Sequence, residues 1–304
     1  MRRKHLLTLL LALLVLTLPT ACRKKTAAED PAAQDGLLYQ SQKPSADSKV
    51  EVRRPHSLEI PAALRTQPEM IITRRGYTTS YNKDWRIPNW VAWHLTAAHS
   101  RGEHKRYNMV FTEDNTVPAP RATDNDYYNS RYDRGHMCPS GDNQWDAKAQ
   151  EESFLFTNIC PQNHGLNQGD WNDLEIQCRY WARQYGDIYI VAGPVFYKGV
   201  QKTIGRNKVA VPDAFFKVIL ADKRKSNAIG FVMPNNGKHR NMKEYVRSID
   251  EIESLTGIDF FPLLDDKVEQ TVEDQRHRDL IEEWKVWKIK HYEFNDDDSR
   301  NTKK

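Results

Sequence analysis

The stretch Asp133–His136 (DRGH), followed thirty-one residues later by Asn167–Glu175 (NQGDWNDLE), decides the fold and the chemistry of this 304-residue chain. It combines a histidine that can accept a proton, an amide and a carboxylate that suit a hard metal ion, and an arginine that can neutralise phosphoryl oxygens. Breaking a phosphodiester bond requires activated water and stabilisation of the charge that develops on the phosphoryl group and the leaving oxygen. The two motifs therefore predict phosphodiester hydrolysis.

The sequence around these motifs alternates between strand-like and helix-like patterns. Apolar runs bounded by Gly, Pro, Asn and Asp predict strands at Met70–Arg74, Ile188–Ala192, Lys208–Val211, Phe215–Leu220 and Ala228–Met233. Helices are predicted at Asn143–Glu152, at Trp171–Tyr185, where apolar residues recur every three or four positions, and from the capping box at Ser248 to just before Gly257. The interspersed elements indicate an α+β domain with a central, largely antiparallel sheet flanked by helices.

Four further segments add to the two motifs: Asn89–His94, Thr157–Gln162, Val191–Phe196 and Val211–Lys217. With them, the chain from about Met70 to Leu264 resembles the DNA/RNA non-specific endonucleases of the ββα-metal (His-Me finger) group. The resemblance implies a ββα-metal active-site motif within the α+β fold. It also implies hydrolysis of DNA and RNA with Mg²⁺ or another hard divalent cation such as Mn²⁺.

His136 is the expected general base, because a neutral imidazole can take a proton from the attacking water. Gly135 is expected to keep bulk away from the imidazole ring. Asp133 is expected to be structural and to hold the hairpin through hydrogen bonds.

The resemblance assigns the second motif to the metal and the phosphate. It implies that Asn167 binds the metal through its amide oxygen, that Glu175 orients water beside the metal, and that Arg179 contacts phosphate. It also implies that Asn158 supports the metal or phosphate site. The residues alone also allow three other interpretations. Asn167 could belong to a turn before a helix, Glu175 and Arg179 could form a surface ion pair, and Asn158 could be a buried, hydrogen-bonded amide.

Arg134 and Arg106 are candidates for a phosphate clamp, since guanidinium groups match phosphoryl oxygens bidentately. Global charge gives no indication of a nucleic-acid partner: removing residues 1–21 takes away three basic residues and no acidic one, which lowers the net charge from +4 to +1. A nuclease of this composition must therefore use a local basic surface.

The N-terminus predicts export. Residues 2–4 are basic and Leu6–Leu18 is an apolar run too short to span a bilayer, which is typical of a signal peptide. The sequence before Cys22 resembles a bacterial lipoprotein signal and predicts lipidation of that cysteine; an ordinary cleaved signal, with a secreted or periplasmic product, is the alternative. We expect a signal at residues 1–21, a flexible tether at 22–55, the nuclease domain at 56–294 and a disordered tail at 295–304.

Cys138, Cys160 and Cys178 remain after Cys22, so at most one disulfide can form among them. Buried free thiols and a single bridge are both compatible with the sequence. A zinc site is not supported, because the chain has no C-x-x-C pair.

The predicted function is non-specific cleavage of DNA and RNA by an enzyme anchored in the bacterial envelope, with the outer membrane favoured. Two alternatives remain: a catalytically silent lipoprotein that captures nucleic acid, and a phosphodiesterase of small nucleotides. The sequence leaves open whether the protein is a monomer or a homodimer.

Overall fold

The computed structural model describes residues 57–221, 227–265, 277–286 and 289. All of them belong to the unit Glu51–Lys304. The predicted signal peptide, the tether with Cys22 and the C-terminal tail lie outside the described residues. Among the residues described, no helix is both long and apolar enough to cross a bilayer.

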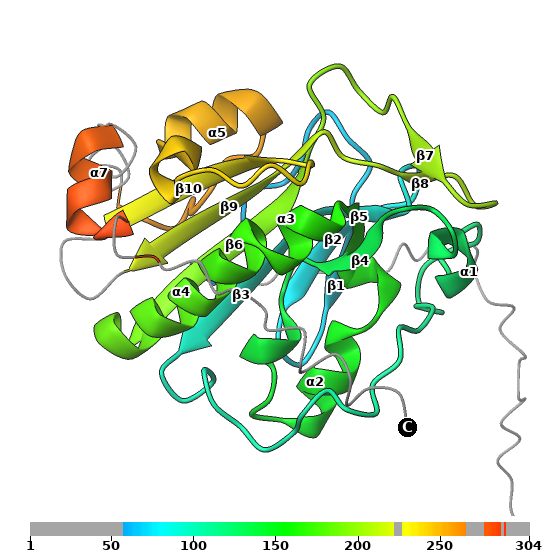
Figure 1. Cartoon of the computed structure of the whole chain (residues 1–304), viewed down its shortest axis with the longest axis horizontal. Helices are drawn as coiled ribbons and strands as arrows, with labels where there is room; N and C mark the ends of the chain where they lie inside the picture. The colour runs from blue at the N-terminus through cyan, green and yellow to red at the C-terminus, as the bar shows by residue number, and fades with distance from the viewer. Residues whose placement is uncertain (1–56, 222–226, 266–276, 287–288, 290–304) are drawn as a thin grey trace, which may run out of the picture. The chain divides into compact units, whose positions relative to one another are not determined.

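A seven-stranded antiparallel sheet forms the centre of this unit (Figure 1). Its strands, in spatial order, are β1 (Met70–Thr73), β2 (Thr78–Asn82), β3 (Ile87–Thr96), β6 (Asp187–Val195), β9 (Ala214–Ala221), β10 (Asn227–Pro234) and β11 (Val246–Arg247). Two separate two-stranded sheets are also present: β4 (Asp133–His136) with β5 (Ile159–Gln162), and β7 (Thr203–Ile204) with β8 (Val209–Ala210). The predicted antiparallel α+β architecture is confirmed.

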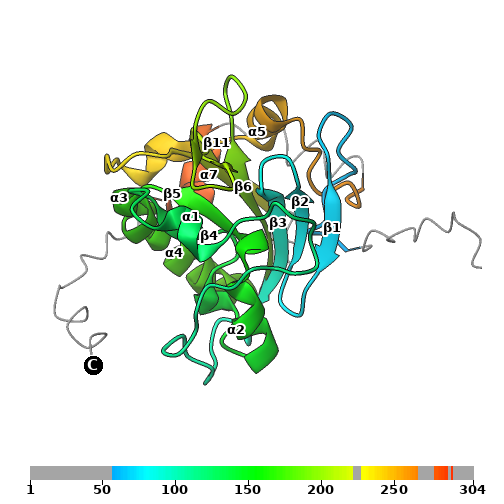
Figure 2. The same ribbon diagram turned by 90° about the vertical axis from the view of Figure 1, so that its right-hand side faces the viewer.

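Helices lie on both faces of the central sheet. They are α1 (Asp124–Tyr127), α2 (Ala147–Ser153), α3 (His164–Gln168), α4 (Asp170–Tyr185), α5 (Ile249–Thr256) and α7 (His277–Glu283), with 3₁₀ turns η1 (Ser140–Asp142), η2 (Phe156–Asn158) and η3 (Met242–Tyr245). Figure 2 shows α4 and the β4–β5 pair on one side of the sheet and α5 on the other. The sheet is therefore buried on both faces.

The two faces carry two separate hydrophobic clusters, because successive side chains of a strand point to opposite sides. In β9, Phe215 and Ile219 join the cluster beneath α4, whereas Phe216 and Val218 join the one beneath α5. Both faces of this strand are fully buried. The cluster beneath α4 also contains Ile159 and Cys160 of β5 and Met137, which follows β4, so the core anchors the segments next to the DRGH motif.

Most predicted elements lie where the sequence placed them, but two differ in extent and others were not predicted. Lys208–Val211 contributes only the short strand β8, outside the central sheet. The helix predicted from Asn143 begins at Ala147, because the side chain of Asp146 accepts hydrogen bonds from the first turn and caps it. The elements that were not predicted are β2, β3, β4, β5, β7, β11, α1, α3 and α7.

The three described cysteines are free and buried. Burial also raises the pKa of the Cys178 thiol to about 12. These thiols are therefore protonated, unreactive core residues rather than a disulfide or a nucleophile.

Candidate active site

A cleft of about 360 Å³ opens over the β4–β5 pair and the first turns of α4. Its walls bring together six of the residues that the sequence singled out, from four separate segments: Arg106, Arg134, His136, Asn167, Glu175 and Arg179. Residues up to 73 positions apart in the chain thus meet around one space. Such a concave site with convergent polar groups is the default location for a reaction.

The DRGH motif is strand β4, and it pairs antiparallel with β5 so that Asp133 lies opposite Gln162 and His136 opposite Ile159. A Cβ on Gly135 would lie 2.3 Å from Oε1 of Gln162, so the glycine makes room for the side chain of the neighbouring strand.

His136 packs against two phenylalanine rings that also contact each other. Its ring centroid lies 5.3 Å from that of Phe111 and 4.9 Å from that of Phe154, which it meets edge-on. Its carbonyl accepts a hydrogen bond from the indole N–H of Trp171 at 3.2 Å. Its Nε2 atom is buried and has no hydrogen-bond partner among the described residues. A packed ring with an unused nitrogen at the cleft is the arrangement that a general base requires.

Burial, together with the smaller effect of the positive charge of Arg106, lowers the pKa of His136 to about 3. The imidazole is therefore neutral throughout the physiological range and able to accept a proton. A phosphate group bound between Arg106 and the ring would act in the opposite direction and raise this pKa, because an anion favours the charged imidazolium. Substrate binding would thus strengthen the base at the moment it is needed.

Asp133 fixes the orientation of Asn167. Its Oδ2 accepts a hydrogen bond from Nδ2 of Asn167 at 2.9 Å and lies 2.9 Å from Nδ1 of His164. Because the amino group of Asn167 is taken by Asp133, the amide oxygen Oδ1 is the atom left for a ligand in the cleft. Asp133 is structural, as expected, but it positions the predicted metal ligand rather than the hairpin.

The donor set of the cleft fits a hard divalent cation that keeps most of its water. Among the described residues there is no group of three or more His, Cys, Asp or Glu side chains that could hold a metal by themselves. The amide oxygen of Asn167 and the nearby carboxylate of Glu175 are oxygen donors of the kind that Mg²⁺ prefers. Mg²⁺ usually has one or two protein ligands and completes its octahedron with water and phosphate oxygens.

Glu175 lies on the second turn of α4 and faces the cleft. Burial raises its pKa to about 7, although the positive charges of Lys217 and Arg179 act against this rise. The carboxyl group therefore changes its charge near neutral pH.

Arg179 lies one turn after Glu175 and is held by a buried carboxylate. Its Nη1 donates a hydrogen bond to Oδ1 of Asp142 at 2.9 Å, and the other oxygen of Asp142 accepts one from the indole N–H of Trp93 at 3.0 Å. Burial would lower the pKa of Arg179, but the carboxylates of Asp142 and Glu175 outweigh it and raise the pKa. The alternative of a simple Glu175–Arg179 surface pair is thus replaced by a buried Asp142–Arg179 ion pair.

Gly141 shapes the space beside this arginine. A Cβ on Gly141 would lie 2.7 Å from Nη1 and 3.0 Å from Cζ of Arg179. The position therefore excludes side chains because the guanidinium group occupies the space.

Arg134 and Arg106 precede His136 in the chain and line the same cleft. Nε of Arg134 donates to Oδ1 of Asp124 at 2.6 Å, and its guanidinium lies over the rings of Phe111 and Tyr127. Arg106 is exposed, and its guanidinium lies 5.7 Å from the ring centroid of Phe154. Arg134 is thus fixed in place, whereas Arg106 is a side chain at the cleft's mouth.

Asn158 is not among the residues that line the cleft, so any support that it gives to the metal or phosphate site is indirect. Its Oδ1 accepts a hydrogen bond from the backbone N–H of Cys138, and its Nδ2 donates to the carbonyls of Cys138 and Ser153. Both N–H groups of the amide are used, its oxygen accepts one bond, and the side chain is fully buried away from the cleft. Asn158 therefore fixes the backbone of Cys138, two residues after His136. This matches the alternative interpretation of a buried, hydrogen-bonded amide.

Sequence reasoning missed Lys217, which is fully buried on β9 below α4. Its ammonium lies 4.1 Å from the ring centroid of Trp171 and has no hydrogen-bond partner among the described residues. Lysine is almost never fully buried without a pair. The alternation along β9, where Phe215 and Ile219 face the same side, is the signal that could have located it.

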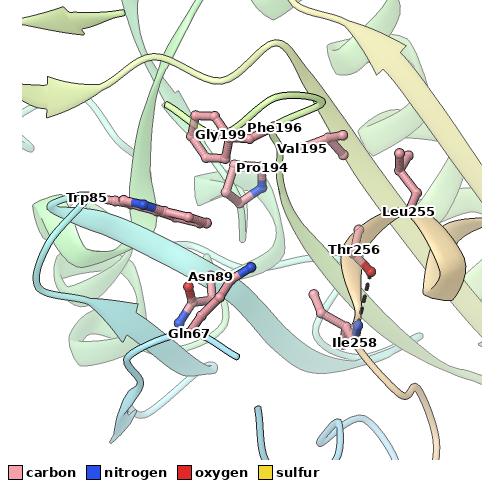
Figure 3. Close-up of a pocket in the computed structure, with 10 residues that line it drawn as sticks. All are labelled: Gln67, Trp85, Asn89, Pro194, Val195, Phe196, Gly199, Leu255, Thr256 and Ile258. Atoms are coloured by element: carbon pink, nitrogen blue, oxygen red, sulfur yellow. Dashed lines mark hydrogen bonds between the residues drawn. The ribbon is translucent and has the colours of Figure 1, made fainter. Parts of the chain in front are cut away.

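A second pocket, of about 230 Å³, is lined by apolar residues, a glycine and three neutral polar side chains, those of Gln67, Asn89 and Thr256, and by no titratable group (Figure 3). The side chains of Asn89 and Thr256 already have partners. The amide of Asn89 bonds to Asn82, Ser80 and the carbonyl of Pro68, and the hydroxyl of Thr256 bonds to Ile252 and Ile258. This pocket therefore presents no chemistry comparable to that of the cleft.

Comparison with known proteins agrees with this geometry. The model of the DNA/RNA non-specific endonuclease family matches residues 60–267. The chain is 38% identical over 216 residues to the mitochondrial nuclease EXOG of Danio rerio, a match that covers 65% of this chain and 63% of that protein. It is 33% identical over 204 residues to human mitochondrial endonuclease G, covering 62% of this chain and 69% of that protein.

A nuclease of the cyanobacterium Nostoc sp. is 32% identical over 223 residues, which cover 69% of this chain and 80% of that protein. A chain in the crystal structure of the EndoG/EndoGI complex superimposes with a TM-score of 0.62 at 29% identity, covering 66% of this chain and 89% of that chain. The chain spans 63% of the length of the zebrafish EXOG nuclease and 56% of that of human EXOG.

Proposed function

This chain belongs to the DNA/RNA non-specific endonuclease family, and on that premise we propose that it hydrolyses phosphodiester bonds within DNA and RNA. The observation that carries the proposal is the unpartnered Nε2 of His136 in a cleft that also holds Asn167 and three arginines. The names of the relatives, nuclease and endonuclease, support the same activity.

In the proposed mechanism, His136 takes a proton from the water that attacks phosphorus. Packing against Phe111 and Phe154 fixes the direction of the ring, and burial keeps it neutral before substrate binds. The hydrogen bond from Trp171 to the His136 carbonyl ties the base to the start of α4, which also carries Glu175.

Asn167 would hold Mg²⁺ through Oδ1, with Asp133 keeping the amide in the required orientation. A bound Mg²⁺ supplies Lewis-acid stabilisation of the charge that develops on the phosphoryl and leaving oxygens. Glu175 orients water at this side of the cleft when it is ionised. Mn²⁺ satisfies the same oxygen donors and is expected to substitute.

The arginines bind and orient the phosphate. Arg179, fixed by Asp142, and Arg134, fixed by Asp124, present guanidinium groups to the cleft without the entropy cost of ordering a free side chain. Arg106 at the mouth completes the clamp. Because these contacts involve phosphate rather than base edges, they predict binding without sequence preference and with strong salt dependence.

We also propose that the protein is exported and held in the bacterial envelope by lipid on Cys22, as its N-terminal sequence predicts. Incorporation of a radioactive fatty acid into the wild type, and its absence in Cys22→Ala, is the expected result. Equal labelling of both proteins would contradict the anchor.

The test of the activity is cleavage of supercoiled plasmid and of structured RNA by the purified protein in Mg²⁺ and in EDTA. We expect loss of both polymers in Mg²⁺ and of neither in EDTA. Salt-sensitive binding without cleavage in Mg²⁺, Mn²⁺ or Ca²⁺ would overturn the enzyme proposal and favour a capture protein. Faster cleavage of a dinucleotide than of polymer would favour the small-substrate phosphodiesterase.

A further inference from the structure

The loop at residues 235–241, between β10 and η3, lies directly against the segment that carries Asn167. Figure 2 shows the chain between these two elements beside α3. Gly237 contacts Gly165 so closely that a Cβ on Gly165 would lie 2.9 Å from the Gly237 Cα atom. His239 approaches Gly169 in the same way, since a Cβ there would lie 2.2 Å from the His239 Cε1 atom. The loop therefore contacts the chain two residues to either side of Asn167.

Hydrogen bonds from Asn235 fix the beginning of the loop. Its Oδ1 accepts from the backbone N–H of Asn163 at 2.7 Å, and its Nδ2 donates to the carbonyls of Pro161 and Pro212 at 3.1 and 2.9 Å. Asn163 is itself the residue that caps α3. Asn235, the first residue of the loop, is thus hydrogen-bonded to Asn163, the N-cap of the helix that carries Asn167.

Asp170 fixes the end of the loop. This carboxylate, buried at the first residue of α4, lies 3.0 Å from Nδ1 of His239 and accepts hydrogen bonds from the backbone N–H of Arg240 at 3.2 Å and from the hydroxyl of Tyr245 at 2.5 Å. These hydrogen bonds fix the backbone of the loop relative to α3 and α4, which carry cleft residues. An ordinary surface loop would have few such attachments.

The side chains of this fixed loop are basic and exposed. Lys238, His239 and Arg240 follow one another and all three are exposed. Neither Lys238 nor Arg240 forms an ion pair within 4.0 Å among the described residues. Nδ1 of His239 faces Asp170, which leaves its Nε2 directed away from that carboxylate. The buried carboxylate of Asp170 thus fixes the loop. The side chains of Lys238 and Arg240 are available to bind an external anion.

We propose that this loop is a second phosphate-binding subsite, in which Lys238 and Arg240 bind the phosphodiester backbone of a DNA or RNA strand beyond the cleft. The inference rests on the proposed function and extends it, since the cleft alone accommodates the phosphate that is cleaved. Gly165 and Gly169 lie on the face of α3 opposite Asn167, so a polymer that continues from the cleft across α3 would reach the loop. The subsite raises affinity for long substrates without reading their sequence.

Binding measured without metal tests this subsite separately from cleavage. The affinity of the full-length protein for a labelled duplex long enough to span cleft and loop is measured by anisotropy in EDTA, from about 50 to about 200 mM KCl. Wild type is compared with Lys238→Gln/Arg240→Gln. The control is Arg65→Gln/Lys83→Gln, which removes the same charge near β1 and β2, at the opposite edge of the sheet.

We expect the slope of log affinity against log salt to fall by about 1.8 in the loop variant, because each of the two phosphates that the loop neutralises contributes about 0.9, and we expect the affinity to fall about tenfold. The control should keep the wild-type slope. In Mg²⁺, the loop variant should lose about tenfold more kcat/KM on polymer than on a p-nitrophenyl ester of a single nucleotide. All replaced side chains are exposed, so thermal unfolding temperatures should match.

A loop variant with the same slope and affinity as the control would overturn the subsite. Equal losses on polymer and on the short ester would also overturn it, because they would place the effect at the cleft. A wild type that binds the duplex but does not cleave it in Mg²⁺ contradicts the proposed activity instead, and the salt slopes still decide the subsite.

Discussion

Replacing Glu175 by glutamine should stabilise the metal-free protein above neutral pH while removing most of its cleavage activity. Glu175 is partly buried on α4, and burial raises its pKa to about 7 against the opposing charges of Lys217 and Arg179. The folded protein therefore disfavours the ionised carboxylate relative to the unfolded chain. Glutamine has nearly the same shape as the protonated acid and no charge, so it removes this cost.

The magnitude follows from the pKa. A carboxyl group with a pKa of 4.5 in the unfolded chain and about 7 in the folded protein favours folding fully only below pH 4.5, and this contribution is lost as the pH rises through 7. The difference corresponds to about 3 kcal/mol at pH 8. Because the side chain keeps some contact with solvent, we expect about 2 kcal/mol, or an increase of about 4–8 °C in Tm.

The assay is urea and thermal unfolding in EDTA at pH 4.5 and pH 8. The free energy of unfolding of Glu175→Gln should exceed that of the wild type by about 2 kcal/mol at pH 8 and by less than about 0.5 kcal/mol at pH 4.5. The control is Glu151→Gln on α2, whose exposed carboxylate forms only a surface ion pair with Lys148 at 3.3 Å. It should change stability by less than about 0.5 kcal/mol at both pH values.

Cleavage of plasmid in Mg²⁺ should fall about 100-fold in Glu175→Gln, since the carboxylate that orients water is removed. A variant that is less stable than the wild type at pH 8, or whose gain in stability does not depend on pH, would refute the electrostatic reasoning. Full activity in this variant would refute the role of Glu175.

Three further changes test the construction of the cleft. Asp133→Ala should raise the Mg²⁺ concentration needed for half-maximal activity about 10- to 100-fold, because the amide of Asn167 loses its anchor; a Mg²⁺ titration of activity that matches wild type contradicts this role. Gly141→Ala should raise KM for polymer about tenfold with little change in Tm, because its Cβ displaces the guanidinium of Arg179, and an unchanged KM in steady-state kinetics would be inconsistent with that contact. Lys217→Met should lower activity about tenfold at pH 7 and restore it toward pH 9, since removing the buried positive charge raises the pKa of the cleft carboxylate; a pH–rate profile parallel to that of wild type would argue against the effect.

Local chemistry made some elements predictable from the sequence. Ser248 and Glu251 form the capping box that starts α5, and Gly257 ends it with a φ of 71°, which favours glycine. The apolar repeat along α4 likewise matched its buried face. In each case the signal lies within about four residues of the structure that it determines.

Strand β3 escaped prediction because its sequence lacks the usual pattern. Pro88 and Asn89 normally mark loops, and nearly all of Ile87–Thr96 is buried, so polar and apolar residues do not alternate. The amide of Asn89 bonds to Asn82, Ser80 and Pro68, and only the folded sheet provides these contacts.

The candidate site, like the fold, was only partly predictable from the sequence. The DRGH motif and the Asn167–Glu175 segment identified groups that face the cleft, but not which residues hold them. Asp142 is 37 positions from Arg179, and Asp133, although it belongs to the motif, is 34 positions from Asn167. No local pattern indicates such pairs, because tertiary packing of α4 against η1 and of α3 against β4 brings them together.

The central claim is that His136 activates water, and the most direct measurement is cleavage by His136→Ala with and without added imidazole. Removing the ring leaves a space beside Phe111 and Phe154 that a free imidazole can enter. The account predicts a loss of about 10²- to 10⁴-fold in Mg²⁺, with partial recovery as imidazole is added. Retention of more than about a tenth of wild-type activity without imidazole would contradict it.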